Sequence, residues 1–192
     1  CYYGFHVETP MLKKAIGFVA FCLIAIALVS LARVSATPIK AAVGQYLLNA
    51  AWEETLNTGD KNKPWADADF QLIGKLTIPR LNVSRVILSS ASGEAMSWGV
   101  GSVMPFKSSS INSPIILAGH RDTHMKFMSK LPIGDHLELQ SHDGSIKSYK
   151  IVASEVTTTP QLTLHDQAKN NDKLILTTCW PFNSVQSGPE RY

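Results

Sequence analysis

The sequence predicts a mainly β fold, a closed barrel of about seven to eight strands with short helices, preceded by a transmembrane helix and an amphipathic helix. Three observations support this fold class. An uncharged apolar run covers residues 15–32, apolar side chains at helical spacing follow from Pro38, and short runs rich in Ile, Val, Leu and Thr begin at Phe70. Closely spaced strands with few helices between them are typical of antiparallel or mixed barrels.

The β-rich runs are separated by Pro, Gly and Asn, which mark turns. We expect strands at Leu72–Ile78, Val83–Leu88, Ile115–Gly119, His136–Gln140, Ile146–Val156 and Lys173–Thr178. A hairpin turn is expected at residues 141–144, because Asp-Gly supplies the backbone freedom that a tight turn needs. Residues 125–131 predict a short helix at most.

The apolar run Ala15–Ala32 contains no charged residue. A helix of this length is about 27 Å long, just enough to cross the hydrocarbon core of a bilayer. Lys13 and Lys14 precede the run, so the positive-inside rule places the N-terminus in the cytoplasm and the rest of the chain on the periplasmic or extracytoplasmic side. A cleaved signal peptide is the alternative, since small residues at 34–36 fit a peptidase site.

The chain therefore divides into four segments. Residues 1–14 form a cytoplasmic tail, 15–32 an anchor in the inner (cytoplasmic) membrane, 37–66 a juxtamembrane helix and linker, and 67–192 the folded domain. Met11 fits a start codon, which leaves open whether residues 1–10 are native.

Charge and cysteine content exclude several classes of protein. Lys and Arg number 18 against 15 acidic residues, and the basic residues do not cluster, so nucleic-acid binding is not expected. The cysteines are Cys1, Cys22 and Cys179, and the folded domain holds Cys179 alone. A disulfide framework or a cysteine-rich zinc site is therefore excluded in that domain.

Two apolar strands each end in a reactive side chain. Residues 115–118 lead into His120, residues 174–178 lead into Cys179, and Arg191 follows twelve residues later. A thiol, an imidazole and a guanidinium suffice for thioester chemistry, because the thiolate attacks a carbonyl, the imidazolium protonates the leaving amine and the cation stabilises the oxyanion. We identify His120, Cys179 and Arg191 as candidate catalytic residues.

Structural roles compete with these assignments. Free cysteine is commonly a small buried hydrophobe, although a lone thiol on an exported domain risks oxidation without structural benefit. His120 and His124 have the spacing of a metal pair on a helix, but no HExxH-type glutamate accompanies them, and a catalytic zinc needs three protein ligands. We expect no metal and no cofactor. Asp122 could orient His120, or it could be a turn residue whose side chain hydrogen-bonds its own backbone.

Three segments together resemble the signature motifs of sortases, which are membrane-anchored cysteine transpeptidases. They are LAGHRDTH at 117–124, LILTTCWPF at 174–182 and GPERY at 188–192. The versions HRDTH, TCWPF and GPERY, with PWAD near residue 65, are most similar to the Gram-negative, marine proteobacterial class. The family pattern continues through a further strand after the arginine, so we expect the last strand of the catalytic domain to be missing from this sequence.

The resemblance implies a function and roles for particular residues. Cys179 would be the nucleophile, His120 the general acid and base, and Arg191 the group that orients substrate and stabilises the oxyanion. It further implies that Thr177 or Thr178 lies near the substrate carbonyl, and Trp180 is a candidate wall of a peptide groove, so these three are the candidate substrate-binding residues. The implied reaction cleaves a C-terminal sorting signal similar to Leu-Pro-x-Thr-Gly, as an endopeptidase would, through a thioacyl intermediate. An amine acceptor on the cell envelope then receives the protein; substrate protein, acceptor and membrane lipid are the expected partners.

Two other function classes compete with this one. An L,D-transpeptidase also uses Cys and His, but its Ser-His-Gly-Cys motif is absent because Thr178 precedes Cys179. Papain-like peptidases place Cys before His, the reverse of the order in this chain. A membrane-anchored binding module without catalysis is the remaining alternative, and replacement of Cys179 discriminates it from an enzyme.

Overall fold

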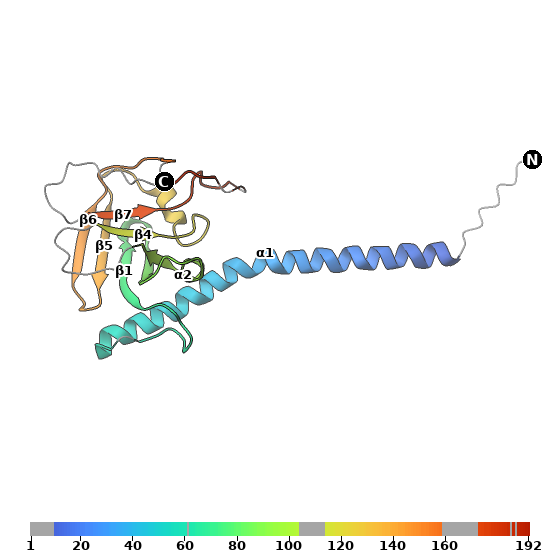
Figure 1. The fold of residues 1–192 in the computed structure, drawn as a ribbon, viewed down its shortest axis with the longest axis horizontal. Coiled ribbons are helices and arrows are strands. Elements are labelled where there is room, and N and C mark those ends of the chain that lie inside the picture. Colours follow the sequence, from blue (N-terminus) through green and yellow to red (C-terminus); the bar gives the residue numbers. More distant parts are fainter. Residues whose placement is uncertain (1–9, 61, 104–113, 159–172, 185, 187) are drawn as a thin grey trace, which may run out of the picture. The chain divides into compact units, whose positions relative to one another are not determined.

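A computed structural model of the chain describes residues 10–60, 62–103, 114–158, 173–184, 186 and 188–192. The structure comprises two compact units, residues 1–39 and residues 40–192. A long helix, α1 (Pro10–Thr58), belongs to both units (Figure 1). The expected boundary between two helices at Pro38 is wrong, because α1 continues through it. Proline removes only one backbone donor from a helix, and no helix-breaking Gly flanks Pro38. The local sequence therefore allows the helix to continue.

The second unit is built on one seven-stranded sheet in the order β6-β5-β1-β2-β3-β4-β7. Its strands are β1 (Leu72–Ile78), β2 (Val83–Leu88), β3 (Val100–Ser102), β4 (Ile115–Ala118), β5 (His136–Ser141), β6 (Ile146–Lys150) and β7 (Leu174–Thr177). The short helices are η1 (Pro79–Leu81), α2 (Gly93–Trp98) and η2 (Lys126–Lys130). The mainly β prediction is thus confirmed, as are six of the strands, with β6 and β7 shorter than expected.

Strand pairing is mixed. β1 lies antiparallel between β2 and β5, whereas β2 pairs with β3 in parallel and β4 pairs with β7 in parallel. The hairpin between β5 and β6 turns at Gly144, whose φ of +80° is a conformation that glycine favours. β3 and α2 were not predicted, because three residues containing a glycine give no periodic signal.

Two hydrophobic clusters hold this unit together. The first lies between the strands and η2, and its buried members are Leu76, Ile78, Ile87, Val100, Leu117, Met125, Phe127, Met128, Leu137 and Leu139. The second packs residues 48–55 of α1 on the opposite face of the sheet. Val86 and Leu88 belong to the second cluster and Ile87 to the first, because successive side chains of β2 point to opposite faces. This part of α1 therefore packs on the surface of the barrel domain.

Residues 190–192 link the two ends of the sheet. Thr178 and Tyr192 exchange both backbone hydrogen bonds, at 3.0 and 2.9 Å, which extends β7. Arg191 exchanges both backbone hydrogen bonds with Thr157, each 2.8 Å long, in the chain that follows β6. The sheet is therefore nearly closed into a barrel, because Arg191 lies between the extensions of its two edges.

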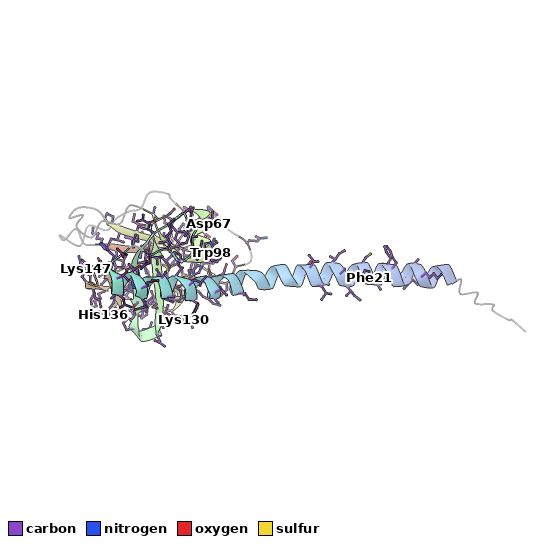
Figure 2. All side chains as sticks on the ribbon, turned by 90° about the horizontal axis from the view of Figure 1, so that it is seen from below. Phe21, Asp67, Trp98, Lys130, His136 and Lys147 are labelled. Atoms are coloured by element: carbon purple, nitrogen blue, oxygen red, sulfur yellow. The ribbon has the colours of Figure 1, made fainter. Side chains whose placement is uncertain are left out.

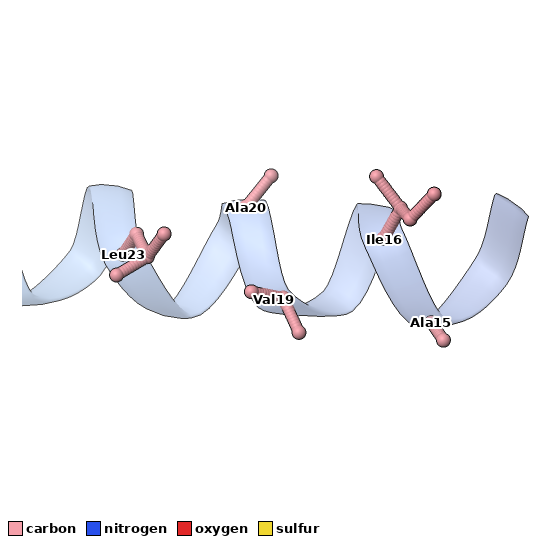
Figure 3. A pocket seen from close by; sticks show the side chains of 5 residues that line it. All are labelled: Ala15, Ile16, Val19, Ala20 and Leu23. Atoms are coloured by element: carbon pink, nitrogen blue, oxygen red, sulfur yellow. The ribbon is translucent and has the colours of Figure 1, made fainter. Parts of the chain in front are cut away.

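In the first unit, α1 carries apolar side chains that remain exposed. Phe21 is 70% exposed and projects from the helix (Figure 2). Five neighbouring apolar side chains line a shallow depression on one stretch of α1: Ala15, Ile16, Val19, Ala20 and Leu23 (Figure 3). Within the described part of the chain, no helix combines the length and the hydropathy of a membrane span. Cys1 and residues 2–9 lie outside the described residues.

Candidate active site

The parallel pair β4–β7 places two of the predicted residues beside each other. Ala118 is the partner of Thr177 in this pairing. His120 lies two residues beyond Ala118, and Cys179 lies two residues beyond Thr177, so both follow their strands by the same distance. Because parallel strands run in the same direction, equal offsets bring His120 and Cys179 out at the same edge of the sheet.

A side-chain hydrogen bond holds these two strand ends together. The buried Thr178 hydroxyl donates to the Gly119 carbonyl at 2.8 Å. Each of these residues directly precedes a candidate catalytic residue, so the bond extends the pairing up to His120 and Cys179. The Thr178 hydroxyl proton is thereby used in a hydrogen bond to the protein backbone. Thr177 lies on the same face of the strand as Cys179, because residues two apart in a strand share a face.

Arg191 stands directly opposite Cys179 in an antiparallel bridge. Since Thr178 and Tyr192 form the adjacent hydrogen-bonded pair, Cys179 and Arg191 form a non-hydrogen-bonded pair. The Cα atoms of such pairs are about 4.5 Å apart, and their side chains lie on the same face of the sheet. The structure thus brings all three predicted residues together at one edge of the barrel.

The Arg191 side chain is exposed and turns toward its own backbone. Its Nη1 donates to the carbonyl of Gly188 at 3.0 Å and to that of Glu190 at 2.8 Å. A guanidinium has five N–H donors, so Nε and Nη2 carry further donors beyond those two bonds. The chain immediately before Arg191 therefore holds its guanidinium through two backbone carbonyls, while the Arg191 backbone lies opposite Cys179.

Trp180 belongs to an aromatic cluster beside the site. Its ring stacks on Tyr192 with centroids 5.6 Å apart and meets Phe182 edge-on at 5.3 Å. Phe182 and Tyr192 also pack against the first hydrophobic cluster. Trp180 follows Cys179 directly, so its side chain points to the opposite face of the extended chain. Trp180 therefore packs against Phe182 and Tyr192, on the opposite side of the chain from the Cys179 side chain.

His124 is buried beneath the turn that carries His120. It is 2% exposed, and its Nε2 lies 3.4 Å from the Ser97 carbonyl. The pKa of His124 is lowered to about 4, mainly by burial; the Ser97 carbonyl opposes this shift, and the charges of Arg85 and His120 contribute to it. Among the described residues, no group of three His, Cys, Asp or Glu could hold a metal ion. His136 and His142 are exposed, whereas His6 and His165 lie outside the described residues.

Arg121 has no role predicted from the sequence, and it is buried although it directly follows the exposed His120. Its guanidinium contacts backbone carbonyls after Cys179. Asp122, considered as a partner of His120, is instead exposed and lies 3.5 Å from Arg121 Nε. Sequence spacing alone does not reveal such a contact, because an arginine in a turn is ordinarily solvent-exposed.

Comparison with known proteins identifies the family. A model of the sortase domain matches residues 76–192, which contain every candidate residue described above. The chain belongs to the sortase family. A curated relative, Sortase D of Bacillus subtilis, is 32% identical over 122 residues, which cover 64% of this chain and 61% of the relative.

Solved sortase structures share the fold. Sortase A from Corynebacterium diphtheriae is 16% identical and superimposes with a TM-score of 0.55. The match covers 84% of this chain and 87% of the Corynebacterium chain. Sortase C from Clostridium perfringens, solved with the C-terminal cell wall sorting motif, is 21% identical with a TM-score of 0.52 and coverages of 76% and 82%. The expectation of a sortase-like barrel is therefore confirmed.

Proposed function

We propose that this sortase is a cysteine transpeptidase that cleaves a Leu-Pro-x-Thr-Gly-like sorting signal and transfers the substrate protein to an amine acceptor on the cell envelope. One observation carries the proposal: Cys179 and His120 end two paired parallel strands at equal offsets, with Arg191 opposite the thiol. A nucleophile, a proton carrier and a fixed cation in this arrangement are the groups that acyl transfer requires.

The reaction follows from the chemistry of these three groups. The Cys179 thiolate attacks the threonine carbonyl carbon, and the C–N bond to glycine breaks as His120 gives its proton to the leaving amine. The resulting thioester is attacked by the acceptor amine, which passes its proton back to His120. The C–S bond then breaks and the thiolate is regenerated. Water in place of the amine gives hydrolysis, which is the endopeptidase outcome.

Arg191 supplies electrostatic stabilisation in this scheme. It does not exchange protons at neutral pH, so its role is confined to hydrogen bonding and charge. Nη2 and Nε are the donors that would reach the substrate carbonyl or the developing oxyanion while Nη1 stays on Gly188 and Glu190. Thr177, on the face of Cys179, is a better candidate for a substrate contact than Thr178, whose hydroxyl proton is already committed.

The test is capture of a thioacyl intermediate. The full chain is incubated with a peptide containing Leu-Pro-x-Thr-Gly, and the mass of the protein is measured before and after hydroxylamine treatment. We expect a hydroxylamine-labile adduct in the wild type and in Cys22→Ala, and none in Cys179→Ala. His120→Ala should lower the rate by at least 10²-fold, within the usual range for loss of a general acid and base. Peptide transfer by Cys179→Ala would refute the proposal.

We further propose that residues 15–32 anchor the protein in the cytoplasmic membrane, with the barrel on the extracytoplasmic side. Support comes from the uncharged run behind Lys13 and Lys14 and from apolar side chains exposed around α1, such as Phe18 and Phe21. Membership of the Gram-negative class is likewise proposed, on HRDTH, TCWPF and GPERY.

A further inference from the structure

Arg121 is a buried cation in a turn, and the residues on either side of it are exposed. The residue is 6% exposed, while His120 before it and Asp122 after it are both exposed. An arginine is almost never this buried unless its donors are satisfied, because removing the charge from water is costly. The contacts of its guanidinium therefore show what the fold uses it for.

The guanidinium of Arg121 makes three hydrogen bonds and one ion pair. Nη1 donates to the Pro181 carbonyl at 3.0 Å, and Nη2 donates to the carbonyls of Gln186, at 3.1 Å, and Ser184. Nε lies 3.5 Å from the exposed Asp122 carboxylate. All three carbonyls belong to residues 181–186, which begin two residues after Cys179. A single side chain thus collects three backbone acceptors from the segment that follows the thiol.

The segment is shaped to present those carbonyls. The Ser184 hydroxyl donates to the Gln186 carbonyl at 3.0 Å, and the Gln186 N–H lies 3.2 Å from the same hydroxyl oxygen. These bonds join Ser184 to Gln186, and the carbonyls of both residues accept from Nη2 of Arg121.

Arg121 and Thr178 cross-link the same two turns on either side of the candidate catalytic pair. Thr178 joins the residue before Cys179 to Gly119, the residue before His120. Arg121, the residue after His120, joins the residues after Cys179. His120 and Cys179 are therefore bracketed between two tethers.

We propose that Arg121 is a positioning residue, which fixes the turn carrying Cys179 against the turn carrying His120 so that a proton can pass during thioester formation and breakdown. This inference rests on the proposed function. Proton transfer requires hydrogen-bond reach or one bridging water, and a displacement of 1 Å can cost about 10²-fold in rate. A lysine keeps the charge but has one compact ammonium group, which does not span three carbonyls as a planar fork does.

Two variants test the tether from its two sides. Arg121→Lys removes the fork, and Ser184→Ala removes the hydroxyl that shapes the acceptor turn without touching the buried cation. Arg80→Lys is the matched control, because Arg80 also donates to a backbone carbonyl, that of Lys130 at 2.6 Å, and pairs with Asp135, and neither partner belongs to the two turns that carry His120 and Cys179. Kinetics of peptide transfer, melting temperature and amide hydrogen exchange are measured on the full chain.

We expect Arg121→Lys to lower kcat at least 10-fold with KM for the peptide changed less than twofold, and to speed amide exchange in residues 178–186. Ser184→Ala should lower kcat about threefold, and adding it to Arg121→Lys should have little further effect, because coupled residues are not additive. Arg80→Lys should retain the kcat of the wild type.

Several outcomes would overturn the inference. They are a wild-type kcat in Arg121→Lys, a raised KM with unchanged kcat, or a kcat loss matched by an equal loss in Arg80→Lys. If Arg121→Lys does not fold, a wild-type kcat and unchanged amide exchange in Ser184→Ala overturn it instead. Failure of the proposed function is distinguished by Cys179→Ala, and the exchange measurement requires no substrate.

Discussion

Arg191 is a residue with two partners, since its backbone pairs with Thr157 and its side chain shares a face with Cys179. Arg191→Lys leaves the backbone pairing intact and keeps the charge, but it removes the fork of donors. We expect kcat/KM for peptide transfer to fall by about 10²–10³-fold, the typical loss for one oxyanion donor. Melting temperature should change little. A variant with wild-type kcat/KM would show that charge alone is sufficient.

His124 makes stability depend on pH. Its pKa is lowered from 6.5 to about 4 in the folded protein, so below pH 6.5 the unfolded chain binds a proton that the folded protein does not. The free energy of unfolding should therefore be constant above pH 6.5 and decrease as the pH falls toward 4. The full loss is on the order of 3 kcal/mol, from about 1.4 kcal/mol for each pH unit between the two pKa values.

Denaturant unfolding between pH 4 and 7.5 measures this effect. His124→Gln should show a flatter dependence than the wild type, whatever its stability at pH 7.5. His142→Gln, at an exposed histidine of the β5–β6 turn, is the matched control and should keep the wild-type slope. Equal slopes in all three proteins would exclude His124 as the source.

At the scale of elements, β3 depends on a close approach between backbones. A Cβ added to Gly101 would overlap the Ser90 carbonyl oxygen and lie 2.7 Å from the Ala91 Cα. Gly101→Ala should therefore force β3 away from the chain that follows β2, at a cost of at least about 1–3 kcal/mol, the usual range for overpacking. Gly93→Ala is the control, since nothing lies within 4 Å of a Cβ there. A thermal melt compares them, and equal melting temperatures would contradict the expectation.

Prediction from sequence succeeded where a local pattern decides the structure. β1, β2 and β5 follow from alternation and β-branched content, and the site follows from two strands that each end in a reactive residue. It failed where long-range contacts decide. α1 continues through Pro38 although local signals favour a boundary there, and Arg121 is buried by carbonyls 60 to 65 positions away. No local pattern encodes which carbonyls a charged side chain will meet.

At the scale of the whole molecule, the apolar run of residues 15–32 belongs to the first compact unit and the strands belong to the second. We expect the full chain to stay in the membrane fraction after carbonate washing, because residues 15–32 form an uncharged run behind Lys13 and Lys14. A variant with two charges in the run, Ile24→Lys with Leu28→Lys, should be released, while Lys14→Arg should not. Recovery of wild-type protein in the wash, or of a form starting near Thr37, would contradict the anchor.

We expect the bridge through Arg191 to be locally less stable than the hydrophobic core. The contacts that join Arg191 to Thr157 and residues 190–192 to the strand of Cys179 are a few backbone hydrogen bonds, at half-exposed or exposed residues with the exception of the buried Thr178, whereas the hydrophobic clusters lie under the sheet. Such regions open in sub-global fluctuations well before the core unfolds. If the pairing of residues 190–192 opens, Arg191 moves away from Cys179. Mild denaturant should therefore abolish peptide transfer while the circular dichroism spectrum remains native. We therefore expect the activity to depend on the free energy of closing the barrel and not on that of folding the core.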